Sequence, residues 1–299
     1  MVANTRKLPG LRTSRSAYGR TFVFLRRWPV IPIFIIACLA IGAIFAGFLS
    51  PHDPKKGDLG GRNLPPGWVT NGEWTHPLGT DRIGRDMFSR LLYGARISLM
   101  VAAVAVTVGT VAGTVAGLVA GYFGGLVDET LMRLVDLWSA LPFLLIALIV
   151  AVSVGPSLWM VIGLLAFSSW SAGARNIRGD VLSLKTRDYV ALAKIAGASH
   201  SRIMFRHLLP QVTHVVIVIT TLRIGSLIIA EAGLSFLGVG VPASVPTWGI
   251  MIAEGRQYLL TTWWIAVFPG MAIFVTVMAF NFLGDWLRDR LDPRLRQLA

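Results

Sequence analysis

The chain has 299 residues, of which 54% are hydrophobic and 14% charged, and its mean hydropathy is +0.65. This composition is too apolar for an ordinary soluble domain and predicts an integral membrane protein that lies in a lipid bilayer. The net charge of +13 could suit nucleic acid, but the basic residues flank apolar segments, which argues against a nucleic-acid partner. The single cysteine, Cys38, lies inside an apolar segment and offers neither a disulfide nor a metal site.

Six apolar segments are long enough to cross a bilayer, for which a helix needs about 20 residues. We expect the spans at residues 28–49, 97–123, 137–154, 157–174, 212–237 and 263–283. The predicted fold class is therefore an all-α membrane protein with six transmembrane helices. Pro142 is expected to bend the third span, because proline removes a helical hydrogen bond.

Lysine and arginine gather on one side of this predicted bundle. They are frequent in the basic N-terminal segment 1–27, in the connection 175–211 and in the tail 284–299. Because basic flanking residues tend to stay in the cytoplasm, we expect both termini and that connection to be cytoplasmic. The segment 50–96 would then lie outside, and 97–283 would hold the other five spans.

The second half of the segment 50–96 is predicted to form an amphipathic helix at the membrane surface. Apolar and polar residues alternate there at helical spacing. The apolar set is Ile83, Met87, Phe88, Leu91 and Leu92, and the opposite set is Arg82, Arg85, Asp86, Ser89 and Arg90. A solvated helix without a partner is the alternative interpretation.

The second span carries a stripe of glycines at intervals of four residues. Since residues four apart share one helix face, the stripe allows another helix backbone to approach closely. The four helix-packing residues are Gly109, Gly113, Gly117 and Gly121. Such a stripe indicates packing and not chemistry.

Residues 188–210 form a polar interruption between the fourth and fifth spans, and their pattern predicts two short helices. Gly197 can end the first helix, because glycine adopts the left-handed conformation without a steric clash. The expected caps are Thr186 or Asp188 for the first helix and Ser199 or Ser201 for the second, which would run to Pro210. A helix-turn-helix outside the membrane is suited to binding another protein.

The fifth span contains two charged residues, Arg223 and Glu231. A charge at that depth costs about 2.5 to 3.5 kcal/mol on insertion scales, so each should face protein or water. Both residues are candidates for a translocation path, and pairing of Arg223 with a neighbouring helix is the alternative.

The chain shows no pattern for catalysis or cofactor binding. A GxxxxGK[ST] phosphate loop does not occur, so no cofactor is expected in this chain. The histidines are scattered without an HExxH motif, which predicts no metal site. Ser168, Ser169 and Ser235 lack a plausible His and Asp setting, so we expect no catalytic residues and no enzyme.

The interruption at 188–210 resembles the coupling loop of ABC importer membrane subunits. That family's pattern is Glu-Ala-Ala, three residues, Gly, nine residues, Ile-x-Leu-Pro. Aligned on Gly197, the chain agrees at Ala193, Leu209 and Pro210 and departs at Ala191, Leu192 and His207. The departures affect the salt bridge or cap that the family's Glu would supply.

Further strings resemble the C-type membrane subunit of dipeptide and oligopeptide (peptide/nickel) ABC importers, and the likeness covers His76 to Arg294. These strings are HPLGTDRIGRDMFSRLLYGARISL, EAGLSFLGVG, Trp248-Gly249 and NFLGDWLRDRLDPR. The resemblance implies a permease of a prokaryotic plasma (inner) membrane. It also implies as partners a second, homologous permease, two ATPase subunits that bind ATP and Mg²⁺, and an extracytoplasmic solute-binding protein.

The resemblance also implies a role for residues 188–210 as a lever that docks on one ATPase. The residues expected to take part are Asp188, Ala191, Ala193, Ala196, Gly197, Arg202, Arg206, His207, Leu209 and Pro210. Dipeptides or oligopeptides are the expected solutes, with nickel, glutathione or another small solute as alternatives. A stand-alone, ion-coupled secondary transporter and an intramembrane enzyme are interpretations of other classes.

Overall fold

A computed structural model describes residues 29–291, so the predicted segment 1–27 and the end of the tail 284–299 lie outside it. Within this range the chain is helical, and an isolated bridge joins Thr80 to Asp86. The α-helices are α2 (Val30–Ile44), α3 (Ala46–Leu49), α4 (Met87–Phe123), α5 (Gly125–Ala140), α6 (Phe143–Val154), α7 (Leu158–Leu184), α8 (Asp188–Ile195), α9 (His200–Arg202), α10 (Leu209–Phe236), α11 (Trp248–Gly255) and α12 (Trp264–Leu291). Short 3₁₀ helices are η1 (Leu59–Gly61) and η3 (Arg256–Tyr258), and η2 (Ile203–Leu208) is a π-helix.

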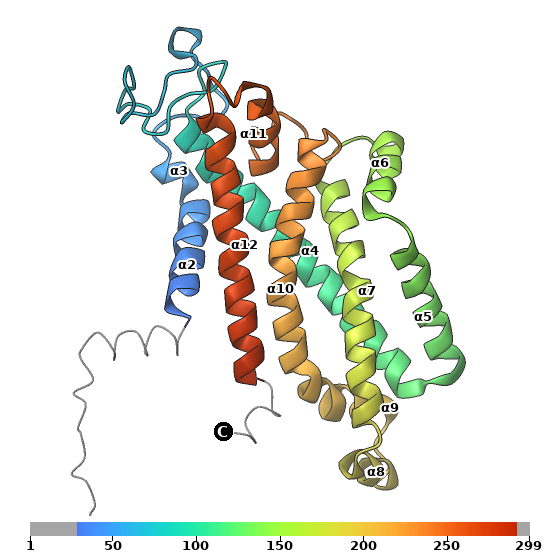
Figure 1. The fold of residues 1–299 in the computed structure, drawn as a ribbon. Helices are drawn as coiled ribbons and strands as arrows, with labels where there is room; N and C mark the ends of the chain where they lie inside the picture. The colour runs from blue at the N-terminus through green and yellow to red at the C-terminus, as the bar shows by residue number, and fades with distance from the viewer. Residues whose placement is uncertain (1–28, 292–299) are drawn as a thin grey trace, which may run out of the picture.

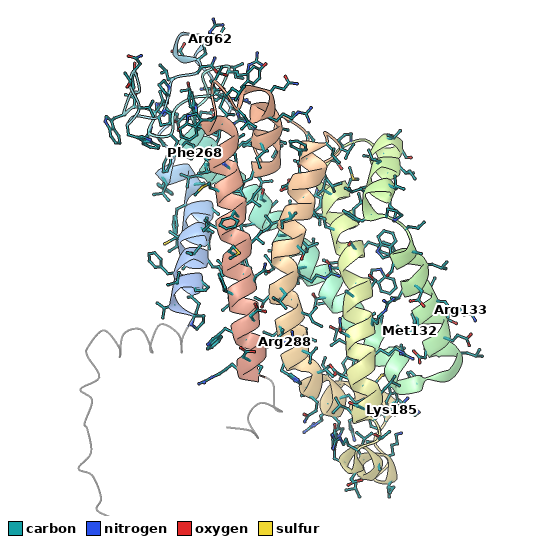
Figure 2. All side chains as sticks on the ribbon, in the orientation of Figure 1. Arg62, Met132, Arg133, Lys185, Phe268 and Arg288 are labelled. Carbon is teal, nitrogen blue, oxygen red and sulfur yellow. The ribbon has the colours of Figure 1, made fainter. Side chains whose placement is uncertain are left out.

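The long helices form one bundle with a different structure at each end (Figure 1). Helices α2, α12, α10 and α7 stand side by side, and α4 crosses behind them. The irregular segment that precedes α4 covers one end together with α11, while α8 and α9 project from the other end. Arg62 marks the first end, and Lys185 and Arg288 lie near the second (Figure 2).

Helix α4 begins earlier than the span predicted at 97–123, and it replaces the predicted amphipathic surface helix. Asp86 caps it by accepting a hydrogen bond from the Ser89 amide at 2.7 Å. The residues just before Asp86 form turns, so Ile83 is not helical. Ser89 and Arg90, predicted to face solvent, are fully buried. The prediction was wrong because Arg85 and Arg90 do not face solvent: both form ion pairs with Glu254 of α11.

The glycine stripe of α4 faces α7, and this is the most extensive helix contact in the fold. A Cβ atom built on Gly109 would lie 2.5 Å from the Ala166 carbonyl oxygen, and one on Gly113 would lie 2.4 Å from that of Trp170. The same construction on Gly117 and Gly121 meets α7 at 2.6 and 2.8 Å. Any side chain at these four positions would therefore push the two helices apart.

Two helices, α5 and α6, cover the predicted third span at 137–154 together with the connection that precedes it. Helices α5 and α6 meet at a break with a bend of 84°. Leu141 and Pro142 both have extended backbone angles there. Because a residue before proline disfavours the α conformation, Pro142 ends one helix and starts another instead of bending one.

Several predicted spans begin or end at different residues in the structure. The first breaks at Phe45 into α2 and α3, and the fourth continues to Leu184 as α7. The sixth continues as α12 into the predicted tail. Hydropathy reveals only the apolar part of a helix, and polar turns that continue it beyond the membrane carry no such signal.

Length and composition identify three helical segments as able to cross a membrane: α4, residues His200–Phe236 and α12. The bent pair α5 and α6 would make a fourth span. Helix α2 is apolar but has 15 residues, and α7 carries polar residues in its second half. The described residues therefore form an all-helical bundle with three or four apolar spans by these criteria.

We predict that Gly113→Ala lowers the stability of the purified protein. Overpacking of this kind costs about 1 to 3 kcal/mol, because the new methyl group would overlap the Trp170 carbonyl. Thermal unfolding followed by tryptophan fluorescence would measure the loss. Gly163→Ala is the matched control, since a Cβ atom built on that α7 glycine would meet no atom of another element within 4 Å. Equal unfolding temperatures for the two variants would contradict the packing argument.

Candidate functional site

The projecting end of the bundle is a helical hairpin formed by residues 188–210, which we call the hairpin. Its first helix, α8, has Arg187 as N-cap without a side-chain hydrogen bond, so neither Thr186 nor Asp188 caps it. Gly197 ends it with a φ of +76°, as the sequence predicts. The Ala198 amide donates to the Ala193 carbonyl and the Gly197 amide to that of Lys194, both at 3.0 Å, which is a Schellman ending.

The second half of the hairpin runs without interruption into the fifth span. Of the two predicted caps, Ser199 is the one used, and its hydroxyl accepts from the Arg202 amide at 3.3 Å. Helix α9 continues through the π-helix η2 into α10. Pro210 is therefore the second residue of α10 and lies within a continuous helical segment. A force on α9 would act directly on this segment.

The hairpin presents small and apolar side chains to solvent. Val190 anchors α8 in a buried cluster with Leu208 and residues of α4 and α7. On its outer side, Leu192 is 65% exposed and Ile195 83% exposed. Among the predicted coupling residues, Ala193, His207 and Leu209 are half-buried, whereas the others are exposed: Asp188, Ala191, Ala196, Gly197, Arg202, Arg206 and Pro210.

Polar contacts that the sequence did not reveal attach the hairpin region to the end of α4. The Tyr122 hydroxyl lies 2.8 Å from Nδ1 of His200, and Lys194 lies over the Tyr122 ring at 5.6 Å. The Lys185 ammonium donates to the Gly121 carbonyl at 2.7 Å. These partners are far apart in the chain, so no local spacing signals them.

The two charged residues of the fifth span lie in different surroundings. Glu231 is fully buried, and its carboxylate accepts hydrogen bonds from Ser98 at 3.0 Å and Ser235 at 2.8 Å. Arg223 is half-buried, and within residues 29–291 its side chain has no hydrogen-bond or ion-pair partner. Glu231 therefore faces protein in this conformation, and the two residues do not pair.

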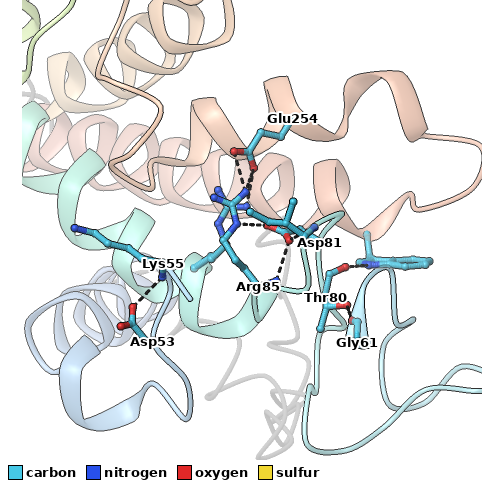
Figure 3. Close-up of polar contacts among 10 residues, drawn as sticks. Asp53, Lys55, Gly61, Thr80, Asp81, Arg85 and Glu254 are labelled. Atoms are coloured by element: carbon cyan, nitrogen blue, oxygen red, sulfur yellow. Dashed lines mark hydrogen bonds and ion pairs between the residues drawn. The ribbon is translucent and has the colours of Figure 1, made fainter. Parts of the chain in front are cut away.

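The opposite end of the bundle is held by a network of buried and partly buried charges (Figure 3). Arg90 is 1% exposed, and its Nη1 donates to Asp81 at 2.5 Å and to Glu254 at 2.6 Å. Arg85 donates to the same two carboxylates, through Nε at 2.5 Å and through Nη2 at 3.1 Å. Each charge has a partner of opposite sign, which a buried charge requires.

Tryptophans extend this charge network into the bundle. The indole of Trp264 at the start of α12 donates to the Thr80 carbonyl at 3.0 Å, and that of Trp248 in α11 donates to the Leu91 carbonyl at 3.1 Å. The string HPLGTDRIGRD thus connects the first loop to α11 and α12. Its likeness to the ABC importer family singled it out in the sequence, but local spacing did not reveal these distant partners.

The structure also brings together three potential metal ligands, two of which are histidines that look scattered in the sequence. One ligand atom from each of His52, His76 and Asp86 lies within 4.8 Å of the other two. They stand beside the start of α4 and all lie between residues 52 and 86 of the chain.

A helical bundle with three or four apolar spans and a projecting helical hairpin defines the class of all-helical membrane proteins. The family "binding-protein-dependent transport system inner membrane component" matches residues 113–297. The dipeptide transport system permease protein DppC of Bacillus subtilis is 39% identical over 99% of this chain and 90% of its own length. DppC of Escherichia coli K12 is 43% identical over 89% of this chain and 88% of its length.

The nickel transport system permease protein NikC of Escherichia coli K12 is 39% identical over 92% of this chain and 97% of its length. The chain therefore belongs to the binding-protein-dependent inner membrane components, as an ABC importer permease of the peptide/nickel family. A chain of the inward-facing MetNI methionine ABC transporter shares the fold, with a TM-score of 0.55 at 19% identity over 68% of this chain and 96% of its own.

We predict that Arg90→Met destabilises the protein by about 1.5 to 3 kcal/mol, because it removes the charged hydrogen bonds to Asp81 and Glu254 and leaves Arg85 as their partner. The control is Arg133→Met, which breaks the exposed ion pair with Glu129 on α5 and should cost about 0 to 1 kcal/mol. Thermal unfolding of both purified variants would measure the difference. A loss for Arg90→Met no larger than for the control would contradict the role of the charge network.

Proposed function

We propose that this chain is the permease subunit of an ATP-driven importer of dipeptides. The observation that carries the proposal is the identity of 38 to 43% with dipeptide permeases over most of the chain. A second, homologous permease would complete the translocation path, and two ATPase subunits would bind ATP and Mg²⁺. An extracytoplasmic binding protein would deliver the solute and impose most of the selectivity.

In the proposed topology the chain crosses the membrane six times. Helices α2, α4, the bent pair α5 and α6, α7, α10 and α12 each count as one span. By the positive-inside rule, the hairpin and both termini would lie in the cytoplasm and the charge network outside. Exposed apolar side chains on α6, such as Val152 and Val154, are suited to contact with lipid or with the second permease.

The hairpin is proposed to couple ATP turnover to the bundle. Exposed Leu192 and Ile195 provide an apolar surface for a groove on an ATPase, and the small residues Ala191 and Ala196 beside them allow close approach. Arg202 and Arg206 could pair with acidic groups at the rim of that groove. When the ATPases close, the hairpin would move as a unit and tilt α10 with it.

Arg223 is the residue that we place along the translocation path. It is half-buried without a charged partner within the described residues, and lipid contact would be costly. Water, or a carboxylate of a passing peptide, could satisfy it once the second permease encloses that side. Glu231 was a candidate for the same role, but its bonds to Ser98 and Ser235 suit a structural contact between α4 and α10.

Reconstitution tests the proposed function and its alternatives. We expect proteoliposomes with all the proposed subunits to accumulate a labelled dipeptide when ATP and the binding protein are present. The chain alone should show no uptake, with or without an ion gradient. Uptake of nickel and not of dipeptide would support the nickel alternative, and ATP-independent uptake by the single chain would support a secondary transporter.

We predict that Gly197→Val lowers solute-stimulated ATPase activity and uptake about tenfold. A non-glycine residue in the left-handed region costs about 1 to 2 kcal/mol. A cost of that size lowers the equilibrium population of the native hairpin conformation, relative to a distorted one, about tenfold. Gly155→Val is the matched control, because Gly155 has a φ of +88° and open surroundings but lies between α6 and α7. If the two variants lose activity equally, or if Gly197→Val loses none, the lever mechanism is wrong.

A further inference from the structure

Three segments meet beside the N-terminus of α4, and each brings one side chain able to bind a metal. His52 follows α3, His76 belongs to the turns before α4, and Asp86 is the N-cap of α4. One ligand atom from each lies within 4.8 Å of the other two. The cluster is separate from the hairpin and from the charge network.

The donor groups face one another. Nδ1 of His76 lies 3.0 Å from Oδ1 of Asp86, and the rings of His52 and His76 have their centroids 4.5 Å apart. Within residues 29–291, the His52 ring forms no hydrogen bond, so its nitrogens remain available. A hydrogen bond between His76 and Asp86 would explain why these two side chains lie together, but it would not explain why His52 lies beside them.

Asp86 is held in the orientation that a metal ligand needs. Its Oδ2 accepts hydrogen bonds from the Ser89 amide at 2.7 Å and the Ser89 hydroxyl at 2.6 Å, which leaves Oδ1 directed at His76. The His52 amide donates to the same Ser89 hydroxyl at 3.2 Å. Metal-binding carboxylates are commonly fixed by such outer contacts.

We propose that His52, His76 and Asp86 bind one divalent transition-metal ion such as Zn²⁺. The ion would tie the irregular segment that precedes α4 to the first turn of that helix. Two imidazoles and one carboxylate suit Zn²⁺, Co²⁺ or Ni²⁺, whereas Mg²⁺ and Ca²⁺ prefer oxygen ligands. A water molecule would take the remaining position.

Only a small movement is needed to close the site. Bonds of about 2.0 to 2.1 Å place the ligand atoms of a tetrahedral zinc site about 3.3 Å apart. His52 is exposed and lies in an irregular segment, so its ring can move closer to the other two. His52 also lines a surface pocket of 690 Å³, through which an ion can enter.

Metal binding to the full-length chain tests the site. The protein would be purified in detergent with a tag that contains no histidine, stripped with a chelator and dialysed against Zn²⁺. We expect one equivalent of zinc by mass spectrometry after gel filtration, and no binding of Mg²⁺. Co²⁺ should give visible absorption bands that disappear when Zn²⁺ is added.

Variants connect this binding to the three residues. His52→Gln, His76→Gln and Asp86→Asn should each weaken zinc binding at least about tenfold, and asparagine keeps the cap of α4. His214→Gln, on α10, is the matched control and should bind like the unaltered protein.

The proposal is overturned if the unaltered protein retains less than one equivalent of Zn²⁺ or shows no cobalt bands. It is also overturned if the cluster variants bind as tightly as His214→Gln does. Should a variant fail to fold, the cobalt spectrum of the unaltered protein still decides the matter. None of these measurements depends on transport.

Discussion

The close approach of α4 and α7 is the constraint on which the rest of the bundle depends. Glycine at four successive turns lets the two backbones meet where side chains would otherwise separate them. In a membrane, where lipid is as apolar as leucine, such close packing is a main source of helix association. The other long helices then pack around this pair, with the larger apolar cluster formed among α4, α7, α10, α11 and α12.

Helix α4 also joins the two polar ends of the molecule. At its start, Asp86 caps the helix, and Arg90 belongs to the charge network that reaches α11. At its far end, Tyr122 contacts His200 of the hairpin. The helix spans 37 residues without a break, so a shift at one end is carried to the other instead of being absorbed between them.

Local pattern was enough to predict the features that depend on neighbours in sequence. Apolar length revealed the bundle, the interval of four residues revealed the glycine stripe, and Gly197 with Ser199 revealed the turn of the hairpin. The predicted surface helix at 83–92 failed because Glu254, 164 residues beyond Arg90, neutralises a side chain that local spacing assigned to solvent. The cluster of His52, His76 and Asp86 could not be predicted from local spacing either, since His52 and Asp86 meet only in the folded chain.

Continuity between the hairpin and α10 determines how the hairpin can move. Helix α9, η2 and α10 form one helical segment, so the second half of the hairpin cannot swing independently of the bundle. Helix α8 is attached at the Gly197 turn and through Val190 in the buried cluster. A displacement of α8 would therefore reach α10 through that cluster and through the Gly197 turn. The packing of Val190 in the cluster would determine the direction of the movement. The π-helix at 203–208 interrupts the α-helical hydrogen-bond pattern of this segment, and π-helical turns of this kind are frequent at functional sites.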